Sequence, residues 1–177
     1  MSNKEHPWSV PIRVEDVPEG GRHFELGADE ATRARLTEVA GVNGVTRMHA
    51  AFDVRRQGGS GLHVVGEISA TVRQTCVVTL DPVLNDVIEA VDLVFAPGGS
   101  VTGPAIPVSL DAEESSEPMS DGVVDLGAVA TEFLVLGIDP YPRKPGAVFE
   151  LPQDSDREES PFAPLATWKK KHDGPER

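Results

Sequence analysis

The stretch VTRMHAAFDVRRQGGSGLHVVGEISATVRQ, residues 45–74, decides the fold. Apolar and polar residues alternate in it on both sides of the glycine-rich segment 58–61. A period of two predicts a β-strand with one buried face, and a glycine-rich break between two such strands predicts a β-hairpin. The buried face of this hairpin should carry the even-numbered residues Met48, Ala50, Phe52, Val54, Leu62, Val64, Ile68, Ala70 and Val72.

The even numbering also restricts the register of the hairpin. The numbers of two cross-strand partners must add to an even sum, because an odd sum would turn the buried face of one strand toward solvent. We therefore expect partner sums of 116 or 118, with a connection of three or five residues and not of two or four.

Further strands are expected on both sides of this hairpin. Residues 8–14 and 22–26 form short apolar segments, and Pro11 places the first of them at a sheet edge because proline has no N–H to donate. A long strand should follow at residues 84–96, but its apolar residues change face on the way. A β-bulge at residues 89–91 would reconcile the two faces.

Two segments have the spacing of amphipathic helices. Residues 28–40 carry Asp29 and Glu30 in the first turn, where carboxylates favour a helix N-terminus, and Gly41 follows as a stop. Its expected apolar stripe is Ala31, Ala34 or Arg35, Leu36, Val39 and Ala40.

The second helix should run over residues 125–136, with Asp125 as its N-cap and Gly137 after it. Its expected stripe is Leu126, Val129, Ala130, Phe133, Leu134 and Leu136. Because a sheet needs one face covered, we predict an α+β domain over residues 1–148. It should consist of a mainly antiparallel sheet, open or barrel-like, covered by these two helices.

Charge is concentrated in the middle of the chain. Twelve of the 29 acidic residues lie between Cys76 and Pro142, where there is no Lys or Arg, and they account for almost all of the net charge of −13. Within this stretch we expect a long acidic loop at about residues 97–122, with one further strand at residues 106–110 as its only element. The polar residues 149–177 should form a disordered tail.

The composition excludes several classes of protein. Nucleic acids are bound mainly through Lys and Arg, so an acidic chain of this kind is not a DNA-binding protein. No apolar run is long enough for a membrane span and no signal peptide is visible, so we expect a cytoplasmic protein. One cysteine, Cys76, permits neither an internal disulfide nor a multi-thiolate zinc site, and we expect it to be a buried structural residue.

No catalytic constellation is evident. The serine in segment 58–61 lacks the spacing of a nucleophile elbow, and residues 97–103 lack the Lys-Ser/Thr ending of a phosphate-binding loop. The five histidines have no carboxylate or cysteine at metal-ligand spacing. We therefore expect a non-enzymatic protein without cofactor or metal.

Two surfaces are candidates for binding. The outward face of the hairpin should present Arg47, Arg55, Arg56 and Arg73, with His49 and His63 beside them, as a weak and salt-sensitive RNA contact. The acidic residues Asp111, Glu113, Glu114 and Glu117 should lie in a mobile segment that attracts a basic partner. For both surfaces the alternative is an ordinary solvated face.

The order of three features resembles the YceD family, the large ribosomal RNA subunit accumulation proteins. They are a turn of the form Cys-x-x-Thr-Leu-x-Pro, an acidic loop, and a helix that opens with Asp-Leu and is followed by Asp-Pro-Tyr-Pro. The matching residues are Cys76, Leu80, Pro82, Asp125, Leu126, Glu132, Leu134 and Pro142. The resemblance covers about residues 45–145, with one departure: Thr79 stands where many members have a second cysteine. A metal or redox role based on a Cys-x-x-Cys pair is therefore not carried over.

The resemblance implies a role in accumulation or processing of large-subunit ribosomal RNA, in a bacterial cytoplasm or a plastid. Ribosomal proteins, processing factors or precursor large-subunit ribosomal RNA would be the partners, and no catalytic residue is implied. An alternative from another class is a binding module for a small molecule or lipid precursor, with an apolar pocket on the sheet.

Overall fold

The computed structural model describes residues 6–97, 116–119 and 121–149. The chain divides into two compact units, Met1–Ala147 and Val148–Arg177, and every helix and strand of the described residues belongs to the first. The predicted strand at residues 106–110 and the tail from residue 150 onward lie outside the described residues. In chain order the elements are β1 (Pro11–Arg13), the 3-10 helix η1 (Val14–Asp16), β2 (Arg22–Gly27), α1 (Glu30–Ala40), β3 (Gly44–Gln57), β4 (Gly61–Thr75), β5 (Pro82–Pro97), β6 (Ser116–Met119), β7 (Val123–Asp125) and α2 (Leu126–Gly137).

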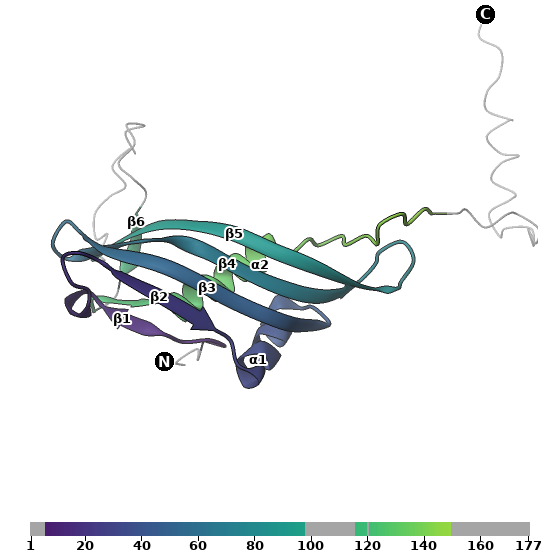
Figure 1. The fold of residues 1–177 in the computed structure, drawn as a ribbon, viewed down its shortest axis with the longest axis horizontal. Helices are drawn as coiled ribbons and strands as arrows, with labels where there is room; N and C mark the ends of the chain where they lie inside the picture. The colour runs from purple at the N-terminus through teal and green to yellow at the C-terminus, as the bar shows by residue number, and fades with distance from the viewer. Residues whose placement is uncertain (1–5, 98–115, 120, 150–177) are drawn as a thin grey trace, which may run out of the picture. The chain divides into compact units, whose positions relative to one another are not determined.

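An open five-stranded sheet forms the centre of this unit (Figure 1). Its strand order is β2-β3-β4-β5-β6, and every pair is antiparallel except β5 with β6. A separate two-stranded sheet pairs β1 with β7. The α+β class is confirmed, but the barrel-like alternative is wrong. The sheet does not close because α2 fills the space over its inner face and the edge strands β2 and β6 do not pair with each other.

The central hairpin has the register that its parity requires. Partner numbers sum to 118 from Arg47 and Thr71 to Gln57 and Gly61, which leaves three residues in the connection. Both connecting glycines adopt positive φ angles, +58° and +80°. The register shifts by one residue near Thr46, a β-bulge that the alternation did not reveal.

Strand β5 differs from its prediction. It pairs with β4 in one unbroken register along its whole length, so the bulge expected at residues 89–91 is wrong. Its odd-numbered residues, including Val87 and Val91, face the core. The strand needs no bulge because Leu84 and Ile88 remain on the outer face, each 64% exposed.

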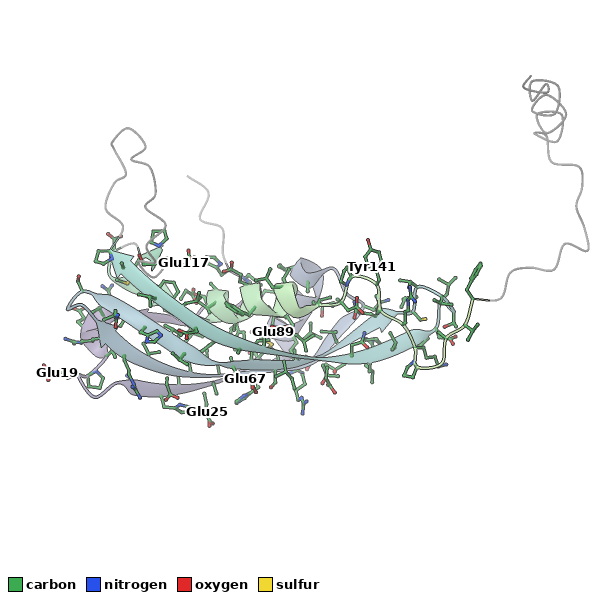
Figure 2. All side chains as sticks on the ribbon, turned by 90° about the horizontal axis from the view of Figure 1, so that it is seen from above. Glu19, Glu25, Glu67, Glu89, Glu117 and Tyr141 are labelled. Atoms are coloured by element: carbon green, nitrogen blue, oxygen red, sulfur yellow. The ribbon has the colours of Figure 1, made fainter. Side chains whose placement is uncertain are left out.

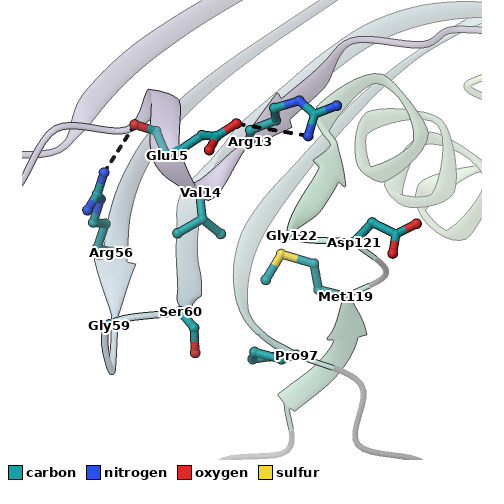
Figure 3. Close-up of a pocket in the computed structure, with 10 residues that line it drawn as sticks. All are labelled: Arg13, Val14, Glu15, Arg56, Gly59, Ser60, Pro97, Met119, Asp121 and Gly122. Atoms are coloured by element: carbon teal, nitrogen blue, oxygen red, sulfur yellow. Dashed lines mark hydrogen bonds and ion pairs between the residues drawn. The ribbon is translucent and has the colours of Figure 1, made fainter.

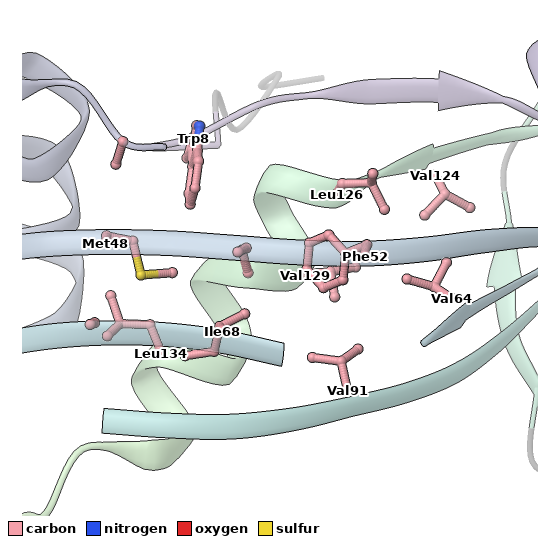
Figure 4. Packing of buried hydrophobic residues seen from close by; sticks show 14 of the residues in the cluster. Trp8, Met48, Phe52, Val64, Ile68, Val91, Val124, Leu126, Val129 and Leu134 are labelled. Carbon is pink, nitrogen blue, oxygen red and sulfur yellow. The ribbon is translucent and has the colours of Figure 1, made fainter. Parts of the chain in front are cut away.

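A core of aliphatic residues lies between the sheet and α2 (Figure 4). Phe52 is fully buried, and its ring covers its cross-strand partner Gly66, where a Cβ would collide with it. Four of the six predicted stripe residues of α2 are buried, Phe133 is half-buried, and Leu136 is 71% exposed. Asp125 caps this helix as predicted, by accepting hydrogen bonds from two amides of the first turn.

Helix α1 begins after the N-cap Asp29 and ends at Gly41, which has a φ of +64°. Its predicted stripe is largely wrong, because Leu36 is its one buried apolar residue and Val39 is 55% exposed. The helix contacts β3 and α2 at one end of the sheet and does not lie across it, so a narrow strip of the helix suffices for packing.

The acidic loop also contains structure that the sequence did not reveal. Strand β6 falls within residues 97–122 and pairs in parallel with the end of β5. Glu117 belongs to this strand, so its expected place in a mobile segment is wrong. The other three acids of that group, Asp111, Glu113 and Glu114, lie outside the described residues.

Candidate functional site

The predicted RNA-contact residues do not form one basic surface. Arg47, Arg55 and Arg73 are exposed at odd-numbered positions, which lie on the outer face of the sheet. Arg55 follows Arg47 by eight residue steps along β3, a distance of roughly 26 Å at the rise of an extended strand. A cluster that could clamp adjacent phosphates is therefore not formed by these three arginines.

Arg56 lies on the other side of the sheet, so its placement on the outer face is wrong. Its guanidinium donates hydrogen bonds to the backbone carbonyls of Val17, at 2.6 Å, and Glu15, at 3.1 Å. These bonds hold the short segment around η1 against the hairpin. The role of Arg56 in the fold is thus to fasten the N-terminal segment.

Acidic side chains are interspersed with the arginines on the outer face. Figure 2 shows Glu25 and Glu67 on the side of the sheet away from α2. His63 contacts Asp92 at 2.7 Å, and His23 contacts Asp53 at 3.0 Å. The Asp53 carboxylate, chiefly through this hydrogen bond, raises the pKa of His23 above its usual value. This face is of mixed charge, which weakens the case for direct RNA contact.

The family-signature residues gather at two places, of which the first is the turn between β4 and β5. Cys76 is fully buried, and three backbone N–H groups point at its sulfur: those of Lys144 at 3.3 Å and of Val78 and Thr79 at 3.4 Å each. Together with the Thr79 hydroxyl they lower the pKa of the Cys76 thiol to about 6, with the amide of Lys144 contributing most and burial opposing the shift. The predicted burial of Cys76 is confirmed.

The same turn is tied to the segment that follows α2. The amide of Val77 donates to the carbonyl of Pro142 at 2.9 Å, and Lys144 Nζ lies 3.1 Å from a carboxylate oxygen of Asp81. The hydrogen bond from Lys144 Nζ, followed by the positive charge of Lys144, lowers the pKa of the Asp81 carboxyl. Pro142 therefore contributes a backbone acceptor that joins the end of α2 to the β4–β5 turn.

Leu80 stands at the tip of this turn in the left-handed region, with a φ of +60° and 76% of its surface exposed. Such a conformation costs a non-glycine residue roughly 1 kcal/mol. Two backbone bonds hold it, from the Leu80 amide to the Cys76 carbonyl and from the Cys76 amide to the Asp81 carbonyl. Pro82 begins β5 directly after them.

The donor set of this turn does not fit a metal ion. Thr79 stands where a Cys-x-x-Cys pair would have its second thiolate, and its backbone amide donates a hydrogen bond to the sulfur of Cys76. No three His, Cys, Asp or Glu side chains come together as a ligand group within residues 6–97, 116–119 and 121–149. The turn is held by amides and by the Lys144–Asp81 pair.

The second group of signature residues builds α2 and its attachment. Leu126 and Leu134 are fully buried, whereas Glu132 is exposed. The carboxylate of Asp125 accepts from the amides of Gly127 and Ala128, and also from the amide of Val10 at 2.7 Å. One side chain thus caps the helix and fastens the N-terminal segment to it.

A pocket of about 460 Å³ opens near the tip of the hairpin, between η1 and the β6–β7 turn (Figure 3). Arg13 and Arg56 line it, but so do Glu15 and Asp121, and Arg13 lies 3.9 Å from a carboxylate oxygen of Glu15. Its opposing charges do not select an anion or a cation.

A groove of about 500 Å³ lies between α2 and the strands β5 and β6, and we name it the α2 groove. Its apolar wall includes Leu93, Phe95, Pro118, Phe133 and Leu136. Three carboxylates, those of Glu117, Asp125 and Glu132, also line it, and no Lys or Arg does. An apolar floor with an acidic rim suits a partner that is both apolar and basic.

Sequence reasoning identified Glu117 and Glu132 but did not bring them together. They lie on β6 and α2, and their proximity follows from the parallel pairing of β6 with β5, which periodicity does not indicate. Neither helix has the length and apolarity of a membrane span, in the part of the chain that the structure describes.

The comparisons with known proteins place these features in a family. The family model of the large ribosomal RNA subunit accumulation protein YceD matches residues 64–169, well over half of the chain. No curated protein and no solved structure matches significantly. The match includes the β4–β5 turn and every residue of the α2 groove, whereas Arg47, Arg55 and Arg56 precede it. The chain belongs to the YceD family.

Proposed function

We propose that the chain is a non-enzymatic factor in large ribosomal subunit biogenesis that supports the accumulation or processing of large-subunit ribosomal RNA in the cytoplasm. The observation that carries this proposal is the family match over residues 64–169. The name of that family refers to large ribosomal RNA subunit accumulation.

The charges on the surface support a protein partner over direct contact with RNA. Phosphate binding requires several unopposed Lys or Arg residues, and the outer-face arginines are spread out among carboxylates. The α2 groove, in contrast, is apolar and acidic and lies wholly in the segment that the family model matches. A basic ribosomal protein or processing factor fits it better than a nucleic acid does.

Among the described residues no histidine is paired with a nucleophilic side chain, which supports a non-enzymatic role. Two histidines contact carboxylates, but both pairs lie on the outer face of the sheet. In the described segments neither histidine hydrogen-bonds to a serine, threonine or cysteine. A base without a nucleophile or a dry pocket is a weak catalytic group.

Deletion of the gene followed by ribosomal RNA profiling tests this function. We expect less large-subunit RNA relative to small-subunit RNA and an accumulation of its precursor, both restored by a plasmid copy of the chain. A normal ratio without precursor in the deletion strain would refute the proposal.

A small-molecule or lipid-precursor binding module is the second candidate, because the volume of the α2 groove falls in the range of small-ligand sites. Its acidic rim disfavours anionic head groups. Thermal-shift screening separates the two candidates: stabilisation by a neutral acyl compound, together with no ribosomal co-sedimentation, would favour the binding module.

A further inference from the structure

Among the described residues, strand β5 has a free edge along most of its length. It pairs with β4 throughout, but β6 joins it only at residues 94–97, so within the described part of the chain residues 82–93 have a strand partner on one side only. The free edge of a strand presents alternate N–H and C=O groups that can pair with another chain. At the other edge of the sheet, β2 is much shorter.

Apolar side chains flank this edge on both faces of the sheet. On the outer face Leu84 and Ile88 are each 64% exposed. On the inner face the α2 groove begins at Leu93, and Leu136 beside it is 71% exposed. A strand added to β5 would place its alternate side chains against these two surfaces, because successive residues of a strand point to opposite faces.

The inner side of this edge is strongly negative. Glu89 lies against Gly137 at the C-terminus of α2, so close that a Cβ on Gly137 would be 2.6 Å from its carboxylate oxygen. The C-terminal end of a helix carries partial negative charge, and the last turn of α2 contains no basic residue to offset it. Glu117 and Glu132 add two carboxylates, and no ion pair to these three glutamates occurs among the described residues.

We propose that the free edge of β5 binds an extended, basic segment of a partner protein by β-strand addition. On its inward face, apolar side chains would enter the α2 groove and Lys or Arg residues would meet Glu89 and Glu132, so basic and apolar residues take turns along that one face. Main-chain pairing supplies affinity in such complexes, and the side-chain pockets supply specificity.

A second copy of this chain is a poor occupant of this edge. Residues 82–93 contain Asp86, Glu89 and Asp92 and no basic residue, so two such strands side by side would repel each other. A basic segment is attracted by the same charges. The inference rests on the proposed function only in expecting a protein partner, and its test is a binding measurement that is independent of ribosomal RNA levels.

The probe, the lysine–valine peptide, is a fluorescently labelled ten-residue peptide in which every second residue is lysine or valine in turn and serine fills the other positions, so that both residue types lie on one face of the strand. It is titrated into the full chain at low and high salt. The glutamate–valine control replaces each lysine of this peptide by glutamate, and the lysine–serine control replaces each valine by serine. We expect binding of the lysine–valine peptide alone, weakened by salt, with NMR shift changes at residues 82–93 and in α2. Amides of β5 that exchange rapidly in the free protein should become protected.

Matched variants locate the site. Glu89→Gln combined with Glu132→Gln should weaken the affinity for the lysine–valine peptide roughly three- to tenfold, as expected for the loss of two exposed charge pairs. Glu67→Gln, on the outer face of β4, should leave binding unchanged. Leu136→Ser should weaken binding, whereas Val39→Ser on α1 should not.

Three outcomes would overturn the proposal: equal binding of the glutamate–valine peptide, shift changes confined to β2 or to the outer face, or protection of all β5 amides before peptide is added. The last would show that this edge is already covered within the chain. If the peptide fails to bind while the deletion strain still loses large-subunit RNA, the surface is wrong and the proposed function stands.

Discussion

Replacing Asp125 by alanine should detach two parts of the fold at once. Its Oδ1 accepts from the amides of Gly127 at 3.0 Å, Ala128 at 3.1 Å and Val10 at 2.7 Å, and its Oδ2 accepts from the Ser9 hydroxyl at 2.6 Å. The helix cap is worth about 1 kcal/mol, and the other two hydrogen bonds are worth about 1 kcal/mol each. We therefore expect Asp125→Ala to lower the free energy of unfolding by roughly 3 kcal/mol.

The matched variant is Asp125→Asn, which keeps an oxygen in the place of Oδ1 and should cost less than about 1 kcal/mol. Urea unfolding followed by circular dichroism measures the stability of both variants. If the slope of the unfolding free energy against urea concentration is unchanged, only stability has changed. A loss below about 1 kcal/mol for alanine would refute the reasoning, because the helix cap and the N-terminal fastening would then be independent of this side chain.

Three further predictions concern the core and the β4–β5 turn. Gly127→Ala should destabilise the protein although alanine favours helices, because a Cβ would lie 2.7 Å from the carbonyl oxygen of Trp8; a rise in Tm would contradict the packing. Leu36→Ala should cost about 2–4 kcal/mol in urea unfolding and Val39→Ala less than about 0.5 kcal/mol; equal losses would restore the predicted stripe of α1. The thiol of Cys76 has its pKa lowered to about 6, so the stability that its thiolate gives over Cys76→Ala should be full above the unfolded thiol's pKa of about 8.5. This stability should be lost as the pH falls through about 6; unfolding curves of the two proteins that stay parallel across that range would contradict it.

The sequence was informative where one face of an element is buried and the other is solvated. The hairpin obeys this condition, and so even its register could be predicted from the parity of residues such as Phe52 and Val64. The N-cap Asp125 was likewise predicted because it acts on neighbouring amides, whereas Asp29, expected in the first turn of its helix, is the N-cap.

The errors arise where packing overrides the local pattern. Ile88 is apolar yet exposed beside the free edge of β5, so the expected bulge was inferred from a residue that the core does not contain. Val39 is exposed because α1 packs at the end of the sheet. Strand β6 was missed because it consists of four residues, includes Pro118, and owes its existence to pairing with β5.

The binding surfaces could be predicted only in part, because they depend on distant elements meeting. The acidity of the middle of the chain was visible, but its concentration beside the end of α2 depends on the contact of Glu89 with Gly137. The depressed pKa of Cys76 depends on the amide of Lys144, which is 68 residues away in the sequence.

The most direct test of the central claim is the ratio of large-subunit to small-subunit ribosomal RNA in a deletion strain that carries a plasmid copy of the chain. With no copy the ratio should fall, and with the wild-type or Glu67→Gln chain it should return to normal. With Glu89→Gln and Glu132→Gln together it should stay low at equal protein level. A ratio that is normal without any copy of the chain would contradict the account.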